Sequence, residues 1–175
     1  MKHVSSRENP TFRMLLALRE SASERRASGR TLLEGIHLVA SYREAVGPPA
    51  MMVVSESGRD NPEVRGLLAG LAGTETVLLP DRLFERVAQV SAPVGIAGVI
   101  PIPVPRSGPQ PQLAILLEDI QDPGNAGTIL RSAAAAGAQA AWLSRGCADP
   151  WSPRVLRAAM GAHFRLAVHA GADLA

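Results

Sequence analysis

The stretch that decides the fold is residues 113–143, LAILLEDIQDPGNAGTILRSAAAAGAQAAWL. It opens with the apolar run Leu113–Leu117, which is typical of a parallel strand covered on both faces. After a polar loop, the pattern predicts a helix from about Ala126 to Ala136, with Gly137 as its left-handed C′ residue. Ala140–Leu143 predicts the next strand, so the stretch indicates a strand–helix–strand crossover of an α/β fold.

A second crossover follows. Ser152-Pro153 is typical of the N-cap and first residue of a helix, and residues 164–168 predict a third strand. The order βαβαβ implies a parallel sheet whose following loops lie at one edge, where open α/β sheets bind ligands. We therefore expect residues 119–126 and 144–153 to share that edge. With only two helices, one face of the sheet should be poorly covered.

An α/β pattern also precedes this stretch. Residues 31–100 alternate between apolar strand segments and amphipathic helices. The segment PIPVPRSGPQPQ, residues 101–112, contains five prolines and is typical of a stiff linker. Asn9-Pro10 predicts the start of a helix, and an arginine-rich polar tether follows it. We predict four parts: a basic N-terminal arm (1–30), a small α/β domain (31–100), the linker (101–112) and a parallel-sheet domain (113–175).

The composition excludes several classes of protein. With 46% hydrophobic residues among 175 and a mean hydropathy of +0.08, the chain can bury a core and is not disordered. It has no apolar run of the roughly 18 residues that a membrane span needs, and its first residues lack a secretory signal, so we expect a cytoplasmic protein without a membrane partner. Cys147 is the only cysteine, and the histidines form no metal-binding spacing, so we expect no metal.

The charge is unevenly distributed. Residues 1–30 hold seven basic and three acidic residues, a net charge of +4, while residues 31–105 have a net charge of −3 and residues 106–175 of +1. A basic arm before a nearly neutral body is typical of proteins that bind nucleic acid, because phosphates attract it and release counterions. A solvated helix face explains the same charges, and the charge pattern leaves both interpretations open.

The loop and helix DPGNAGTILR, residues 122–131, carry the most informative polar side chains. We expect Pro123-Gly124 to make a turn, Asn125 to cap the helix and Gly127 to let a backbone or ligand approach closely. Arg131 follows Asn125 by six residues, and its side chain leans back toward the helix start, so both can meet one substrate. The alternative, which the spacing leaves open, is a simple cap and a surface cation.

A second polar cluster follows the next strand. Arg154 and Arg157 lie on one helix face beside Trp151, so they could hold a phosphate while the indole stacks on a base. A structural helix with solvated arginines is the alternative. The aspartates of this edge are expected to cap loops, not to form an acid–base pair: Asp119, Asp122 and Asp149.

Two segments resemble a known family. Residues 116–138, LLEDIQDPGNAGTILRSAAAAGA, are similar to the first signature of SpoU-type, or TrmH-like, RNA ribose 2′-O-methyltransferases of the SPOUT superfamily. Residues 149–162, DPWSPRVLRAAMGA, resemble the second signature, with Arg154 and Ala159 in place of the usual Lys and Ser. The resemblance implies a homodimeric enzyme that transfers a methyl group from S-adenosylmethionine to a ribose 2′-hydroxyl of rRNA or tRNA.

The resemblance also implies roles for particular residues. Asn125 and Arg131 match the functional pair of the first signature, with Arg131 as the proposed catalytic arginine. Arg7, in the arm, and Arg154 and Arg157, in the second signature, are expected to contact RNA. The segments before the linker resemble the arm and the RNA substrate-binding domain that precede the catalytic domain in many members.

The third signature of the family, which forms a knot and supplies most of the cofactor pocket, has no counterpart in this sequence. We therefore expect only the first part, βαβαβ, of a SPOUT domain, with the cofactor-binding residues largely outside the chain and so unassigned. Two interpretations follow. The chain is a form of a methyltransferase, or it is a truncated, non-catalytic RNA-binding module unable to hold S-adenosylmethionine.

Overall fold

The computed structural model describes residues 1–105 and 110–174 and divides the chain into two compact units, Met1–Ile102 (unit 1) and Pro103–Ala175 (unit 2). The linker predicted over 101–112 begins at Pro101, which closes the last strand of unit 1, and its residues 106–109 lie outside the described residues. Within the described ranges, no helix has the length and apolar character that a membrane span requires.

Unit 1 is built on a five-stranded mixed sheet with the order β1-β4-β3-β5-β2. Strands β1, β3 and β4 are parallel, and β5 runs antiparallel to both β2 and β3. The strands are β1 (Lys2–His3), β2 (Arg30–Glu34), β3 (Met51–Ser55), β4 (Thr76–Leu79) and β5 (Ile96–Pro101).

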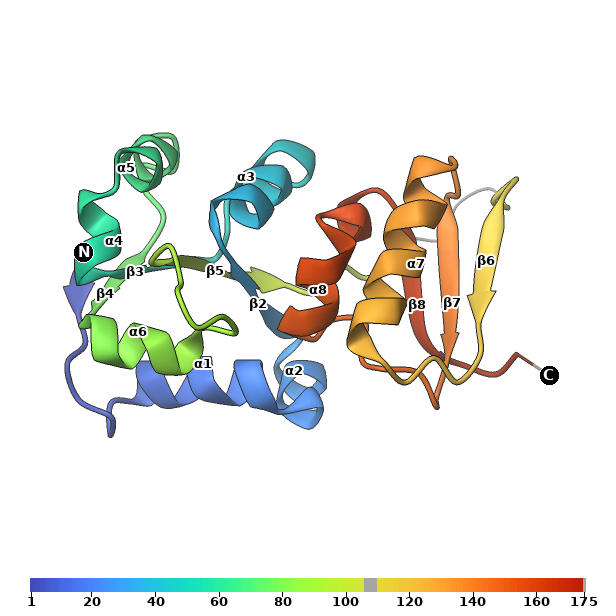
Figure 1. Ribbon diagram of the computed structural model, residues 1–175, viewed down its shortest axis with the longest axis horizontal. Coiled ribbons are helices and arrows are strands. Elements are labelled where there is room, and N and C mark those ends of the chain that lie inside the picture. The colour runs from blue at the N-terminus through green and yellow to red at the C-terminus, as the bar shows by residue number, and fades with distance from the viewer. Residues whose placement is uncertain (106–109, 175) are drawn as a thin grey trace. The chain divides into compact units, whose positions relative to one another are not determined.

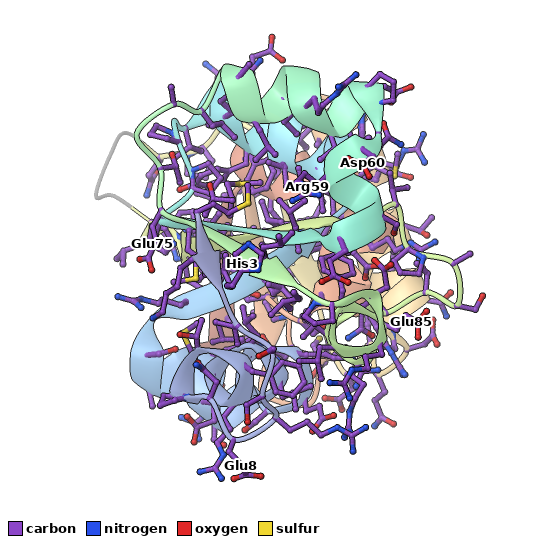
Figure 2. The ribbon with its side chains drawn as sticks, turned by 90° about the vertical axis from the view of Figure 1, so that its left-hand side faces the viewer. His3, Glu8, Arg59, Asp60, Glu75 and Glu85 are labelled. Carbon is purple, nitrogen blue, oxygen red and sulfur yellow. The ribbon has the colours of Figure 1, made fainter. Side chains whose placement is uncertain are left out.

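Six helices cover the two faces of this sheet, with α1, α2 and α6 on one side and α3, α4 and α5 on the other (Figure 1). Figure 2 looks onto the sheet edge at His3 and shows Arg59 and Asp60 on one side of the sheet and Glu8 on the other. The helices are α1 (Pro10–Glu20), α2 (Ala22–Ser28), α3 (Ile36–Ala45), α4 (Glu56–Asp60), α5 (Pro62–Ala69) and α6 (Asp81–Val87).

The main core of unit 1 lies between the sheet and helices α1 and α6. Alternate strand residues such as Val53, Val77 and Leu79 pack there against Phe12 and Phe84, and all five side chains are at most 1% exposed. This arrangement follows from the period of two along a strand, which sends every second side chain to the same face.

The N-terminal segment differs from the predicted arm and tether. Helix α1 buries Phe12, Leu15 and Leu18 in the core, so residues 1–30 are part of unit 1. The segment predicted as a polar tether forms α2 instead, because Ser21 caps it and the buried Arg25 donates hydrogen bonds to backbone carbonyls at the end of α1. The partners that stabilise α2 lie outside the helix, so its own polar composition did not predict it.

Unit 2 is the predicted βαβαβ crossover pair. Its three strands are parallel in the order β6-β7-β8, and α7 and α8 pack side by side on one face (Figure 1). The elements are β6 (Ala114–Leu117), α7 (Pro123–Ala135), β7 (Ala140–Ser144), α8 (Pro153–Ala159), a 3-10 turn at Ala162–Phe164 and β8 (Ala167–Ala172). The third strand therefore begins three residues later than predicted, because the 3-10 turn precedes it.

The other face of this sheet is open within the described residues, as expected from two helices. Leu116, Trp142 and His169 are in register across the three strands and form a row on that face. Leu116 is 67% exposed, and Trp142 stacks on His169 with ring centroids 4.5 Å apart. The apolar run that contains β6 is thus covered on one face only, which corrects the prediction that it is covered on both.

Candidate functional site

The start of α7 differs from the sequence prediction. Asp122, not Asn125, is the N-cap, and its Oδ1 accepts a hydrogen bond from the Asn125 backbone N–H at 2.7 Å. Pro123-Gly124 does not make a separate turn, since these residues are the first two of the helix. Asn125 therefore lies in the first helical turn, and because Asp122 satisfies its N–H, its own side chain is not needed as a cap.

Asn125 and Arg131 both lie on α7 and both are exposed to solvent. Six residues of α-helix place their side chains about 9 Å apart along the axis and about 120° apart around it. A ligand must therefore extend across the helix surface to meet both groups. Neither residue is enclosed by apolar packing, so both are available to a substrate.

Gly127 sets the distance between α7 and α8. A Cβ atom at this position would lie 2.5 Å from Cβ of Ala158, 2.7 Å from the Val155 carbonyl oxygen and 2.9 Å from the Ala159 backbone nitrogen. The prediction that Gly127 admits the close approach of another backbone is confirmed, and that backbone is α8. Ala159, where the family signature usually has Ser, is fully buried in this helix pair.

This contact brings the basic residues of the two signatures onto adjoining helix ridges. Arg131 follows Gly127 by four residues, and Arg154 precedes Ala158 by four, so each lies on the ridge that makes the contact. Arg154 and Arg157 are both exposed on α8. The helix pair thus presents three guanidinium groups from two segments of sequence.

The predicted base-stacking role of Trp151 is wrong. Trp151 is only 6% exposed and its ring packs against His163 at a centroid distance of 5.1 Å, so its face is not available to a base. His163 is itself 2% exposed. Burial lowers the pKa of His163 to about 4, and the Pro150 backbone and the Asp149 carboxylate oppose this shift.

The two loops predicted to share the carboxyl edge of the sheet are bonded to each other. The Asp119 backbone N–H donates to Ser144 Oγ at 3.0 Å, and the Ser144 hydroxyl donates to Asp119 Oδ1 at 3.2 Å. The Ala148 backbone N–H donates to the Ile120 carbonyl at 2.8 Å. The expectation that aspartates bind loops here is also confirmed, since Asp122 caps α7 and Asp149 accepts a hydrogen bond from the Trp151 N–H.

A cavity of about 290 Å³ lies at the same edge. Its lining contains three carboxylates and one guanidinium, so its charge is mixed with an acidic excess. The lining residues are Glu118, Asp119, Ser144, Arg145, Gly146, Ala172, Asp173 and Leu174. The sequence analysis did not single out Glu118, Arg145 or Asp173. Their position directly after the three strands is the signal that could have identified them, because ligands bind where parallel strands end.

Among the residues that the structure describes, no three His, Cys, Asp or Glu side chains come together as a metal-binding group. Cys147 is part of the loop connection, since its thiol donates to the Leu117 carbonyl and its sulfur accepts from the Ile120 N–H.

Comparison with known proteins agrees with this architecture. The model of the SpoU rRNA Methylase family matches residues 112–175. Unit 2 is therefore similar to the members of this family. We refer to unit 2 below as the SpoU unit.

Similarity extends through unit 1 as well. The chain is 34% identical to human mitochondrial rRNA methyltransferase 3, over 88% of this chain and 38% of that protein. It is 30% identical to the 23S rRNA (guanosine(2553)-2′-O)-methyltransferase RlmP of Bacillus subtilis, over 96% of this chain and 64% of that protein. The chain thus spans between about a third and two thirds of the length of these relatives.

Solved structures give the same result. An AdoMet-bound rRNA methyltransferase from Sinorhizobium meliloti superposes with a TM-score of 0.79 at 25% identity. The superposition covers 97% of this chain and 64% of that one. An RNA 2′-O ribose methyltransferase superposes with a TM-score of 0.77 at 28% identity, over 98% of this chain and 66% of that one. Both units therefore share the fold of these solved structures, and the α/β prediction for each is confirmed.

Proposed function

We propose that this chain takes part in the transfer of a methyl group from S-adenosylmethionine to a ribose 2′-hydroxyl of ribosomal RNA. The observation that carries the proposal is the exposed pair Asn125 and Arg131 on α7, beside the arginines of α8 and next to the carboxyl edge of a parallel sheet. Transfer RNA is the alternative substrate, and the two RNAs are compared in the same assay.

In the proposed reaction the ribose 2′-oxygen attacks the methyl carbon, a C–O bond forms and the C–S bond of the sulfonium breaks, and the hydroxyl loses its proton. The guanidinium of Arg131 is a poor general base because guanidinium groups in proteins stay protonated and have no acceptor atom. Arg131 therefore orients the hydroxyl and stabilises the developing alkoxide, while a phosphate or another group takes the proton. Asn125 supplies a neutral donor and acceptor on the same helix.

The cavity at the carboxyl edge fits the charge of the methyl donor. S-Adenosylmethionine supplies the activated methyl group. It carries a sulfonium cation and, at its other end, an amino-acid zwitterion. Asp173 would attract the cationic groups, and Arg145 would attract the carboxylate. The volume of about 290 Å³ lies at the lower limit of small-molecule sites, which run from about 300 to 1,000 Å³.

That small volume favours the second candidate function, an RNA-binding module that does not hold the methyl donor. Titration calorimetry with S-adenosylmethionine separates the two. Micromolar binding contradicts the RNA-binding module, and absence of binding at millimolar concentration contradicts the enzymatic proposal for this chain.

The roles of the basic residues are tested by substitution. Arg131→Ala should abolish methyl transfer from tritiated S-adenosylmethionine to an unmodified 23S rRNA transcript, with an unchanged circular dichroism spectrum. Arg165→Ala, which removes another exposed guanidinium from the SpoU unit, is the matched control. Retention of full activity by Arg131→Ala would refute the assignment. Arg154→Ala and Arg157→Ala should raise the KM for RNA, because we propose that both contact phosphates.

Three further properties belong to the proposal. We propose a homodimer, since the open row of Leu116, Trp142 and His169 would gain burial in an assembly, and light scattering after gel filtration measures its mass. We propose a cytoplasmic location, and cell fractionation tests this. We propose that no metal takes part in the methyl transfer itself, and replacing magnesium with a polyamine to maintain the RNA fold tests that independence.

A further inference from the structure

The loop after β6 contains a non-glycine residue with a left-handed backbone. Asp119 has φ +52°, in the left-handed region that glycine adopts freely and that other residues adopt at a cost. Among the described residues, the only other non-glycine residue with positive φ is Met160. Because the fold alone would favour glycine at position 119, the reason for an aspartate lies in its side chain.

The Asp119 carboxylate is held on two sides. Its Oδ1 accepts a hydrogen bond from the Ser144 hydroxyl, while the Asp119 N–H donates to the same Ser144 oxygen. A Cβ atom at Gly146 would overlap Oδ1, so the absence of a side chain at 146 is what admits the carboxylate. Ser144 and Gly146 both belong to the end of β7 and its loop, so Asp119 fastens the loop after β6 to the loop after β7.

This attachment leads directly to the start of α7. Ile120, the next residue, is fixed by the Cys147 sulfur and by the Ala148 N–H. Two residues later Asp122 caps the helix by accepting the Asn125 N–H. The direction in which the chain enters α7 is therefore determined between Asp119 and Asp122, and Asn125 is the first site residue after that point.

Arg131 is held differently. It lies one turn beyond Gly127, where α7 packs against the backbone of α8. A shift of the loop after β6 changes the first turn of α7 before it changes the packed middle of the helix.

We propose that Asp119 is a positioning residue for Asn125, acting through the left-handed turn that its carboxylate holds closed against Gly146. The inference rests on the proposed function only in that it treats Asn125 as a site residue. The structural test of the inference does not depend on that function. It assigns to Asp119 a role toward Asn125 and none toward Arg131.

The experiment uses the full chain labelled with ¹⁵N and four variants. Asp119→Gly keeps the left-handed backbone without strain but removes the carboxylate, and Gly146→Ala displaces the carboxylate while leaving Asp119 in place. Asp119→Asn keeps both the shape and the acceptor oxygen. Glu118→Ala, which removes a neighbouring carboxylate that lines the same cavity, is the matched control.

The expected result is a change of the Asn125 backbone and side-chain amide signals in Asp119→Gly and in Gly146→Ala, with Asp119→Asn and Glu118→Ala close to the wild-type spectrum. The Arg131 Nε–H signal should stay unchanged in all four. Unchanged Asn125 signals in Asp119→Gly, or a shift of Arg131 as large as that of Asn125, would overturn the proposal.

Methyl transfer to the 23S rRNA transcript provides a second readout. Asp119→Gly should lower kcat by about ten- to a hundredfold with little change in the KM for RNA, as small displacements of site groups do. Combined with Asn125→Ala it should cause no further loss, whereas combined with Arg131→Lys the losses should multiply. Multiplicative losses with Asn125→Ala would contradict the positioning role. If the wild-type chain transfers no methyl group, the proposed function is refuted while the NMR comparison still decides the role of Asp119.

Discussion

At the scale of single residues, His163 makes the stability of the SpoU unit dependent on pH. Burial lowers its pKa from 6.5 to about 4, so the folded protein keeps the ring neutral in a range where an unfolded chain protonates it. The free energy of unfolding therefore has its full value above about pH 6.5. It decreases as the pH falls toward 4, because the unfolded state then binds more protons. The loss amounts to roughly 3 kcal/mol.

His163→Phe should remove this part of the pH dependence. Trp142 and Trp151 are the only tryptophans of the chain and both lie in the SpoU unit, so urea unfolding followed by tryptophan fluorescence reports on that unit. The free energy of unfolding of the wild type, relative to that of the variant, should fall as the pH falls from 6.5 to 4. His37→Gln, which changes an exposed histidine of unit 1, is the control. A constant difference across this range would show that His163 is not buried as a neutral ring.

The sequence predicted the segments that carry the candidate site residues, but not the structural role of each residue. Asn125 was expected to cap α7, yet Asp122-Pro123 repeats the cap-and-proline pattern of Asn9-Pro10 and Ser152-Pro153, so the cap was predictable. The contact of Asp119 with Gly146 was not, because it joins loops that are far apart in sequence. Nor could spacing show that Trp151 turns inward against His163.

At the scale of secondary-structure elements, the close packing of α7 and α8 depends on Gly127. Gly127→Ala should destabilise the SpoU unit by about 1–3 kcal/mol, because its Cβ would press on the α8 backbone. This loss outweighs the gain of about 1 kcal/mol that alanine brings to a helix interior. Urea unfolding followed by tryptophan fluorescence measures it.

Gly66→Ala is the matched control for this prediction. Gly66 lies inside α5, and nothing is within 4 Å of a Cβ added there. The same substitution should therefore stabilise unit 1 by about 0.5–1 kcal/mol, as seen by circular dichroism. Equal effects of the two substitutions would mean that packing against α8 does not determine the choice of glycine at position 127.

Helices with an apolar stripe and a cap signal were predictable, and those without were not. The starts of α1 and α8 agree with the sequence pattern, since Asn9 and Ser152 cap these helices and a proline follows each cap. Helix α2 has no apolar stripe and depends on Arg25 reaching back to Leu18 and Arg19. Strand β1 has two residues and exists only because it pairs with β4, a contact that local sequence does not reveal.

At the scale of the whole molecule, some basic side chains of residues 1–30 are buried or paired with acidic residues, and others are exposed to solvent. Arg25 is buried within unit 1, and Arg13 pairs with Glu8. Arg7, Arg26 and Arg30 are exposed in the same segment. The charge that the segment offers to RNA is therefore smaller than its net value, and it lies on these three arginines and the exposed Lys2.

Replacing Arg7, Arg26 and Arg30 together by Gln should weaken RNA binding and also its salt dependence. Each phosphate contact with a single strand contributes about 0.7 to the slope of log K against log salt, so the slope should fall by about 2. Fluorescence anisotropy with a labelled single-stranded RNA, titrated at several salt concentrations, measures both quantities. The control replaces Arg43, Arg59 and Arg65, which lie on α3, α4 and α5 at the other face of the sheet (Figure 1). Because both triple variants lose the same charge, equal slopes would show that net charge, and not the N-terminal segment, governs RNA binding.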